Sequence, residues 1–319
     1  GIITLAKVAN RNPEQFSTAD LGFSIAPRLN AAGRLDNMSL GVELLLAKDM
    51  QSARELALDL DQLNQTRKEI EAGMKLEALK ICRNFTGFCN ELPMGIALYQ
   101  PDWHQGVLGI VSSRIKDQYH RPVIAFAQDG EGVLKGSARS IEGLHMRDVL
   151  ERIYSQQPNM ILKFGGHAMA AGLTIREECF DDFRRAFNQA VTDWLDEEHL
   201  QGVIWSDGEL REDEFTLATA ELLKAGGPWG QAFPEPCFDG EFNILEQRAI
   251  GQNQNHLKML VEPKRGGPLL DAVVFNIDPR LYPDLSIKQA RLAYKLDINE
   301  FRGNRSVQLL VDYIEPIDG

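Results

Sequence analysis

Strand-like and helix-like segments alternate between residues 92 and 199, and this alternation limits the folds that the chain can adopt. Short runs of β-branched and apolar residues predict strands, and longer runs with apolar residues three or four apart predict helices. The predicted strands are 95–99, 123–127, 133–140 and 170–175, and the predicted helices are 107–119, 146–154 and 178–200. A chain with this order of segments folds into an α/β sheet with helices packed on it.

The last part of the chain, residues 200–319, is predicted to be all-β. A rigid loop rich in glycine and proline at 226–236 comes first, and the sequence Arg302-Gly303-Asn304 favours a hairpin near the end. Strand-like runs lie at 238–249, 257–261, 269–277, 291–298 and 306–314. Five strands is the number found in an OB-type β-barrel, so we expect a barrel of that type.

The first 48 residues look like the last helices of a domain that begins upstream. The sequence has no initiator Met and opens within a helical pattern, so we expect the chain to be a fragment. Pro27 and Gly33 predict that residues 26–36 do not form a regular helix.

A long helix is predicted to follow, from Asp49 as its N-cap to about Asn84. Its polar middle, residues 64–69, favours a strut that bridges two lobes. The apolar spacing fits a helix lying along a single core equally well. The predicted organisation is the end of one domain at 1–48, a connecting helix at 49–91, an α/β domain at 92–199 and a barrel at 200–319.

The net charge of −12 is distributed unevenly along the chain. Residues 1–176 carry 20 Lys and Arg against 19 Asp and Glu, whereas residues 177–319 carry 14 against 27. The first part is therefore able to host a polyanion such as a nucleic acid. For the acidic stretch 177–221 we expect only a solvated face.

Several classes of site are missing from the sequence. Cys82, Cys89, Cys179 and Cys237 show no CxxC spacing, which is typical of reduced thiols in a cytoplasmic protein. No apolar run reaches the roughly 20 residues that cross a bilayer. We find no P-loop, no GxSxG or HExxH motif and no clear metal-ligand cluster. The chain is therefore expected to hold a phosphate but not to cleave it unaided.

The run Phe164–Gly172 contains two glycines followed by a histidine and small residues. Main-chain N–H groups of Gly165 and Gly166 can approach a phosphate without a Cβ clash. His167 can donate a hydrogen bond or a proton to it. The alternative is a structural glycine turn that carries a surface histidine.

Three further segments carry residues suited to nucleic-acid phosphates. In residues 135–140 an arginine lies between two serines, and guanidinium binds phosphate oxygens bidentately; a solvated strand end is the alternative. In residues 101–110, Trp103 can stack on a base and the following helix start favours anions, unless Trp103 fills a core instead. Residues 26–36 hold two arginines, which can instead form an internal salt-bridge network.

These four segments occur in the order found in the DHH/DHHA1 phosphoesterases, which the chain resembles. The resemblance is carried by residues 27–35, 103–110, 136–140 and 164–172 and, with the barrel, is strongest to bacterial single-strand-specific DNA exonucleases. It implies the end of a DHH domain, a connecting helix, a DHHA1 domain and an OB-type domain. It also implies 5′-to-3′ removal of nucleotides from single-stranded DNA in recombination and repair, with Mg or Mn held by a DHH-domain cluster that this chain lacks.

The resemblance also implies roles for individual residues. His167 is the candidate catalytic residue, and together with Gly165 and Gly166 it matches the turn that meets the phosphate near the bond to be cleaved. Ser137 and Arg139 match the motif that grips backbone phosphates. The other candidates for substrate binding are Arg28, Asn30, Arg34 and His104. The implied partners are single-stranded DNA and a single-stranded-DNA-binding protein, and no metal ligand is assigned in this chain.

Two alternative functions stay open. One is a non-catalytic single-stranded-DNA-binding or protein-interaction module in which the barrel dominates. The other is a DHH/DHHA1 oligonucleotide phosphoesterase, which resembles residues 1–199 but has no barrel, so residues 200–319 weigh against it. We expect this chain alone to be inactive as a hydrolase.

Overall fold

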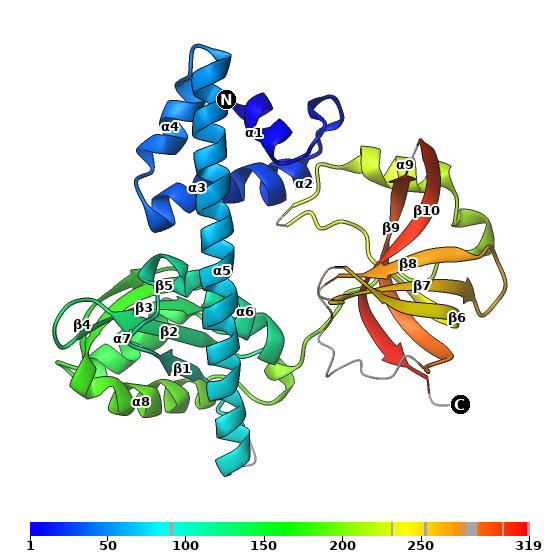
Figure 1. The fold of residues 1–319 in the computed structure, drawn as a ribbon. Coiled ribbons are helices and arrows are strands. Elements are labelled where there is room, and N and C mark those ends of the chain that lie inside the picture. Colours follow the sequence, from blue (N-terminus) through cyan, green and yellow to red (C-terminus); the bar gives the residue numbers. More distant parts are fainter. Residues whose placement is uncertain are drawn as a thin grey trace. The chain divides into compact units, whose positions relative to one another are not determined.

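A computed structural model describes residues 1–89, 92–230, 232–251, 254–275, 277, 286–301 and 303–317. The chain divides into two compact units, Gly1–Gly202 and Val203–Gly319, and each is described by itself (Figure 1). None of the helices in the described ranges combines the length and the apolar character needed to cross a membrane.

The first unit opens with short helices, and one of them corrects a prediction. Residues Ala26–Leu35 form the regular helix α3, after one turn of π-helix at Leu21–Ile25. Pro27 is tolerated because it lies in the first turn, where a backbone N–H needs no helical acceptor. The other short helices are α1 Ile2–Val8, α2 Thr18–Asp20 and α4 Ser39–Leu46.

The long helix α5, Met50–Cys89, joins two hydrophobic cores. The predicted N-cap is confirmed, since the Asp49 carboxylate accepts the Ser52 N–H at 2.8 Å. Toward its start α5 buries Ala53, Ala57 and Leu60 against the short helices. Toward its end it buries residues such as Met74, Ala78 and Cys82 against the sheet. This confirms the strut and excludes a helix along a single core (Figure 1).

A five-stranded sheet forms the rest of the first unit, in the order β1-β2-β3-β5-β4. The β1–β2 pair is parallel and the other pairs are antiparallel. The strands are β1 Ile96–Tyr99, β2 Val123–Gln128, β3 Val133–Arg139, β4 Ile161–Gly166 and β5 Ala170–Arg176, and the helices are α6 Leu108–Tyr119, α7 Met146–Gln156 and α8 Phe180–Thr192. Strand β4 was not predicted, and the helix predicted over 178–200 ends at Thr192.

The two faces of this sheet differ. Helices α7 and α8 cover one face, where β3 contributes Leu134 and Ala138 to the core. Helices α5 and α6 pack on the other face over β1 and β2. Because side chains alternate along a strand, Lys135, Ser137 and Arg139 of β3 point to this second face. Lys135 is exposed there, and Ser137 and Arg139 are half-buried.

The second unit is the predicted barrel. Its strands are β6 Phe238–Ile250, β7 His256–Pro263, β8 Leu270–Val274, β9 Gln289–Phe301 and β10 Asn304–Pro316, closed in the order β10-β8-β7-β6-β9. The expected hairpin joins β9 to β10, with Gly303 at φ +82 (Arg302 lies outside the described residues). Helix α9, Leu217–Gly226, was not predicted; Thr216 caps it and Ala220 packs into the barrel core.

The cysteines whose side chains the structure describes are free thiols, as the reduced-thiol prediction expects. Cys82, Cys179 and Cys237 are free thiols, and the side chain of Cys89 lies outside the described residues. Burial raises the pKa of Cys82 to about 12. We expect iodoacetamide at pH 8 to leave Cys82 unmodified while it alkylates the half-buried Cys179, because the thiolate is the nucleophile. Peptide mass spectrometry of the native protein tests this, and equal labelling of both thiols would contradict it.

Candidate nucleic-acid interface

The Gly-Gly-His segment is the end of a strand and the start of a hairpin. Gly165 and Gly166 end β4, and residues 167–169 lead into β5. Gly166 has φ +151, and a Cβ there would lie 2.4 Å from the Ala170 carbonyl oxygen, so this position requires glycine. At Gly165 a Cβ would meet no atom within 4 Å. Gly166 therefore shapes the hairpin, whereas Gly165 and the exposed His167 face solvent.

The sheet register brings this hairpin beside Ser137 and Arg139. Gly172 pairs with Ser137 on one side and with Gly165 on the other, which places these three residues in one row on the same face. Arg139 pairs with Ala170 at the end of β3. Two of the predicted motifs thus share one glycine-rich surface, where a ligand backbone can approach the sheet closely.

Arg139 is a partly desolvated cation without a carboxylate partner among the described residues. Its Nη1 donates to the Ala138 carbonyl oxygen at 2.7 Å and to Ser137 Oγ at 3.3 Å. Burial lowers the pKa of Arg139, and the nearby positive charge of Arg34 lowers it further. A Cβ on Gly109 would lie 2.6 Å from Arg139 Nη2, so the glycine leaves room for the guanidinium. Two neighbouring arginines in this setting favour an anion between them.

Arg34, near the end of α3, contacts the turn that precedes α6. Its Nη1 donates to the Gly106 carbonyl oxygen at 3.0 Å, and its side chain is otherwise exposed. A Cβ on Gly106 would lie 2.0 Å from the Arg34 carbonyl oxygen, so the two backbones are in direct contact. The end of α3 therefore packs directly on the turn that precedes α6.

The other two candidates on α3 lie differently. The Arg28 guanidinium forms an ion pair with Asp61 of α5 at 2.8 Å and donates to the Ser24 carbonyl oxygen at 2.7 Å. It thereby joins α3 to α5, as the salt-bridge alternative proposed. Asn30 is exposed on α3. DNA contacts for Arg28 and Asn30 stay predictions.

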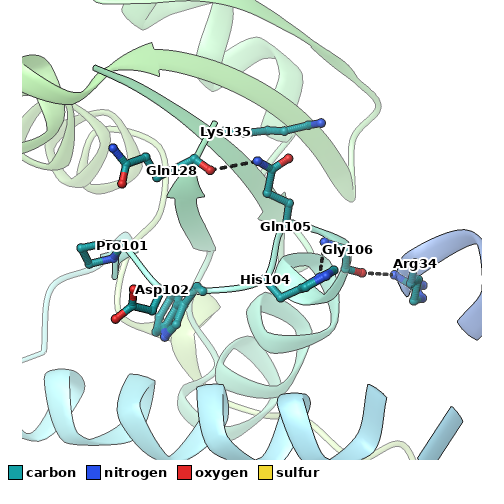
Figure 2. A pocket seen from close by; sticks show the side chains of 9 residues that line it. Arg34, Pro101, Asp102, His104, Gln105, Gly106, Gln128 and Lys135 are labelled. Atoms are coloured by element: carbon teal, nitrogen blue, oxygen red, sulfur yellow. Dashed lines mark hydrogen bonds between the residues drawn. The ribbon is translucent and has the colours of Figure 1, made fainter. Parts of the chain in front are cut away.

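A cavity of about 620 Å³ adjoins Arg34 and is lined by His104, Gln128 and Lys135 as well (Figure 2). His104 Nδ1 accepts the Gly106 N–H at 3.1 Å. The neutral ring therefore carries its proton on Nε2 and keeps one N–H donor. The remaining lining residues are Pro101, Asp102, Trp103, Gln105 and Gly106.

Trp103 fills a core and does not present its ring for stacking. It is 4% exposed and packs in the core between α5, α6 and the sheet. Its Nε1 donates to Glu77 Oε2 at 2.8 Å. The core alternative is therefore correct for Trp103.

The middle of α5 holds a charge network that the sequence did not predict. Glu71 bridges two arginines, pairing with Arg67 through Oε2 and with Arg114 of α6 through Oε1 at 3.0 Å. Arg67 also donates to the buried Asn64 at 2.8 Å. Burial lowers the pKa of Arg67, Glu71 opposes this, and the charges of Arg34 and Arg114 lower it again. Arg34 thus lies near both Arg67 and Arg139.

The described residues contain no group of three or more His, Cys, Asp or Glu side chains that could hold a metal ion. The donor set around Arg139 consists of cations, hydroxyls and backbone groups, which suit an anion. A divalent metal therefore does not fit this surface.

Comparison with known proteins agrees with these features. Residues 93–193 match the DHHA1 domain, and residues 206–313 match the RecJ OB domain. Over 100% of its length the chain is 82% identical to the single-stranded-DNA-specific exonuclease RecJ of Haemophilus influenzae, covering 55% of that protein. It is 57% identical to the Escherichia coli RecJ over 99% of this chain and 55% of the relative. The chain thus spans about half the length of these curated relatives.

A solved structure shares the fold. The crystal structure of RecJ in complex with Mg2+ from Thermus thermophilus superimposes with a TM-score of 0.77 at 25% identity, covering 99% of this chain and 46% of that one. The two domain matches, the identity over the whole chain and the shared fold place this chain in the RecJ family.

Proposed function

We propose that this chain is the part of a single-stranded-DNA-specific exonuclease that holds the DNA strand. The observation that carries the proposal is Arg139, a half-buried guanidinium without a carboxylate partner in the described ranges, which has the positive charge of Arg34 nearby and lies beside a glycine-rich strand pair. A backbone phosphate is the counter-charge that such a pair favours. The relatives are named single-stranded-DNA-specific exonucleases, and we take the kind of nucleic acid and the type of reaction from these names.

In this proposal each of these residues has a different role in binding DNA. Arg139 and Ser137 donate to phosphate oxygens, and Arg34 contributes a second positive charge from α3. Gly165 and Gly172 let the strand approach the sheet because they carry no side chain. His167 lies exposed at the hairpin, where we propose that it meets the phosphate next to the bond that is cleaved.

The hydrolysis itself is proposed for the whole protein, in the 5′-to-3′ direction and within DNA repair and recombination. Structures of a relative are described as complexes with Mg2+ and with Mn2+. We propose that the whole protein uses one of these ions to activate water, held by residues other than those described here. We also propose a single-stranded-DNA-binding protein as a partner and the cytoplasm as the place of action.

The proposal predicts salt-sensitive binding of single-stranded DNA by this chain. If about three phosphates are neutralised, the slope of log affinity against log salt is about −2 for a single strand. Affinity for a single-stranded oligonucleotide should then fall roughly tenfold or more between 50 and 200 mM salt. Fluorescence anisotropy measures this, with a duplex of the same sequence as the comparison. Equal affinity for both forms, or a slope near zero, would contradict the proposal.

A further inference from the structure

We infer that the cavity beside Arg34 holds a second backbone phosphate of the same DNA strand, and that Lys135 binds it. This inference rests on the proposed function and extends the DNA-binding surface beyond Arg139. The residues that carry it are Lys135, Arg34 and His104, which line one cavity although they come from β3, α3 and the loop before α6 (Figure 2).

The cavity has the charge that a phosphate needs. Lys135 supplies an ammonium charge and Arg34 a guanidinium charge, and no carboxylate pairs with either of them among the described residues. His104 adds the Nε2 N–H donor that its bond to Gly106 leaves free. Of the nine lining residues only Asp102 is acidic. The nearby Asp129 carboxylate already accepts the Gln105 amide at 2.9 Å.

The cavity is suited to the backbone of the strand and not to a base. Bases in single strands are bound mainly by stacking on aromatic faces. The aromatic side chain of this cavity, Trp103, is 4% exposed and has its N–H committed to Glu77. What the cavity offers to a ligand is therefore positive charge and N–H donors.

The cavity and Arg139 lie on the same face of the sheet, so one DNA strand can contact both. Lys135 and Arg139 point to the same face of β3 and are four residues apart, which corresponds to about 13 Å along a strand. That span exceeds the roughly 3.4 Å rise per nucleotide of a stacked strand, so the two cations contact phosphates of different nucleotides. Arg34 connects the two places, because its charge acts on Arg139 and its side chain lines the cavity.

The test combines one variant with a chemically neutralised DNA backbone. Each linkage of a short single-stranded oligonucleotide is replaced in turn by an uncharged methylphosphonate, and its affinity for the 319-residue chain is measured by anisotropy. For the unmodified chain we expect affinity to fall when either of two linkages is neutralised, one near the Arg139 contact and another further along the strand. In Lys135→Gln, affinity for the ordinary oligonucleotide should fall roughly tenfold, and neutralising the second linkage should cause no further loss.

Two other variants sharpen the result. Gln128→Glu adds a negative charge at the cavity without a change in side-chain size, so it should weaken the binding of the ordinary oligonucleotide. Replacing the second linkage by a methylphosphonate removes the repelled phosphate charge and should restore much of the lost affinity. Arg147→Gln removes one exposed positive charge from α7, on the opposite side of the sheet, and should change affinity less than about twofold. Lys135 and Gln128 are exposed, so circular dichroism should show both variants folded.

The outcomes separate this inference from the proposed function. If Lys135→Gln weakens binding and makes one linkage insensitive to neutralisation, the cavity holds that phosphate. If Lys135→Gln binds normally, or if every linkage keeps its full effect in the variant, the inference is overturned while DNA binding at Arg139 stands. If the unmodified chain binds no single-stranded DNA, the proposed function itself fails.

Discussion

Replacing Arg139 by Gln is expected to reduce affinity for single-stranded DNA about thirtyfold or more. Truncating one partner of a desolvated charge pair typically costs about 2 kcal/mol or more of binding free energy, which is about thirtyfold. Arg139 qualifies because it is half-buried beside Ser137 and has no carboxylate partner in the described part of the chain. Anisotropy at fixed salt measures the loss, and the salt slope should become shallower by about 0.7.

The same substitution should leave the fold intact, which distinguishes a binding residue from a structural one. Removing Arg139 relieves both its burial and its repulsion by Arg34, the two causes that lower its pKa. The free energy of unfolding should therefore stay constant or rise slightly. Arg139→Lys should recover only part of the affinity, because an ammonium cannot make the bidentate contact. Unchanged binding in Arg139→Gln would favour a module in which the barrel alone holds DNA.

Replacing Glu71 by Ala is expected to lower the free energy of unfolding by about 2–3 kcal/mol. The change leaves Arg67 buried without its carboxylate, and breaking a buried pair costs about 3–5 kcal/mol. The expected loss is smaller than that because the second partner, Arg114, is 54% exposed and can be solvated. Urea denaturation followed by circular dichroism measures the change in unfolding free energy.

Two controls accompany this substitution. Glu69→Ala removes an exposed carboxylate from the same helix and should change the unfolding free energy by less than about 0.5 kcal/mol. Adding Arg67→Met to Glu71→Ala should recover part of the loss, because the unpaired buried cation is then gone. If Glu69→Ala and Glu71→Ala destabilise equally, the bridge between α5 and α6 does not have the strength that its burial indicates.

The fold was predictable where the local pattern and the tertiary environment agree. In the barrel strand β7, buried and half-buried positions alternate, and this alternation is visible in its sequence. The prediction missed strand β4 because it is an edge strand that exposes Leu162 and Lys163 and ends in two glycines. The prediction for helix α3 was wrong because Pro27 was treated as a residue of the helix interior, although it lies in the first turn.

The candidate site was predictable in its parts but not in its assembly. The motifs that carry Ser137, Arg139 and His167 have local signals, namely glycines, an arginine between serines and a histidine. The proximity of Arg34 to Arg139 depends on how α3 packs on the loop before α6, which no sequence spacing encodes. Lys135 lay within a recognised motif and was missed, because only the packing of three separate segments forms the cavity that it lines.

The contact between Gly106 and Arg34 restricts how substitutions can change the size of substrate that family members accept. Main chain meets main chain there, since a Cβ on Gly106 would lie 2.0 Å from the Arg34 carbonyl oxygen. How closely α3, which carries Arg34, approaches the turn before α6 is therefore limited by backbone atoms and not by side chains. Substitution of surface side chains does not change a distance that backbone atoms set. A family member that accepts a bulkier polymer would therefore need a different backbone conformation at this point.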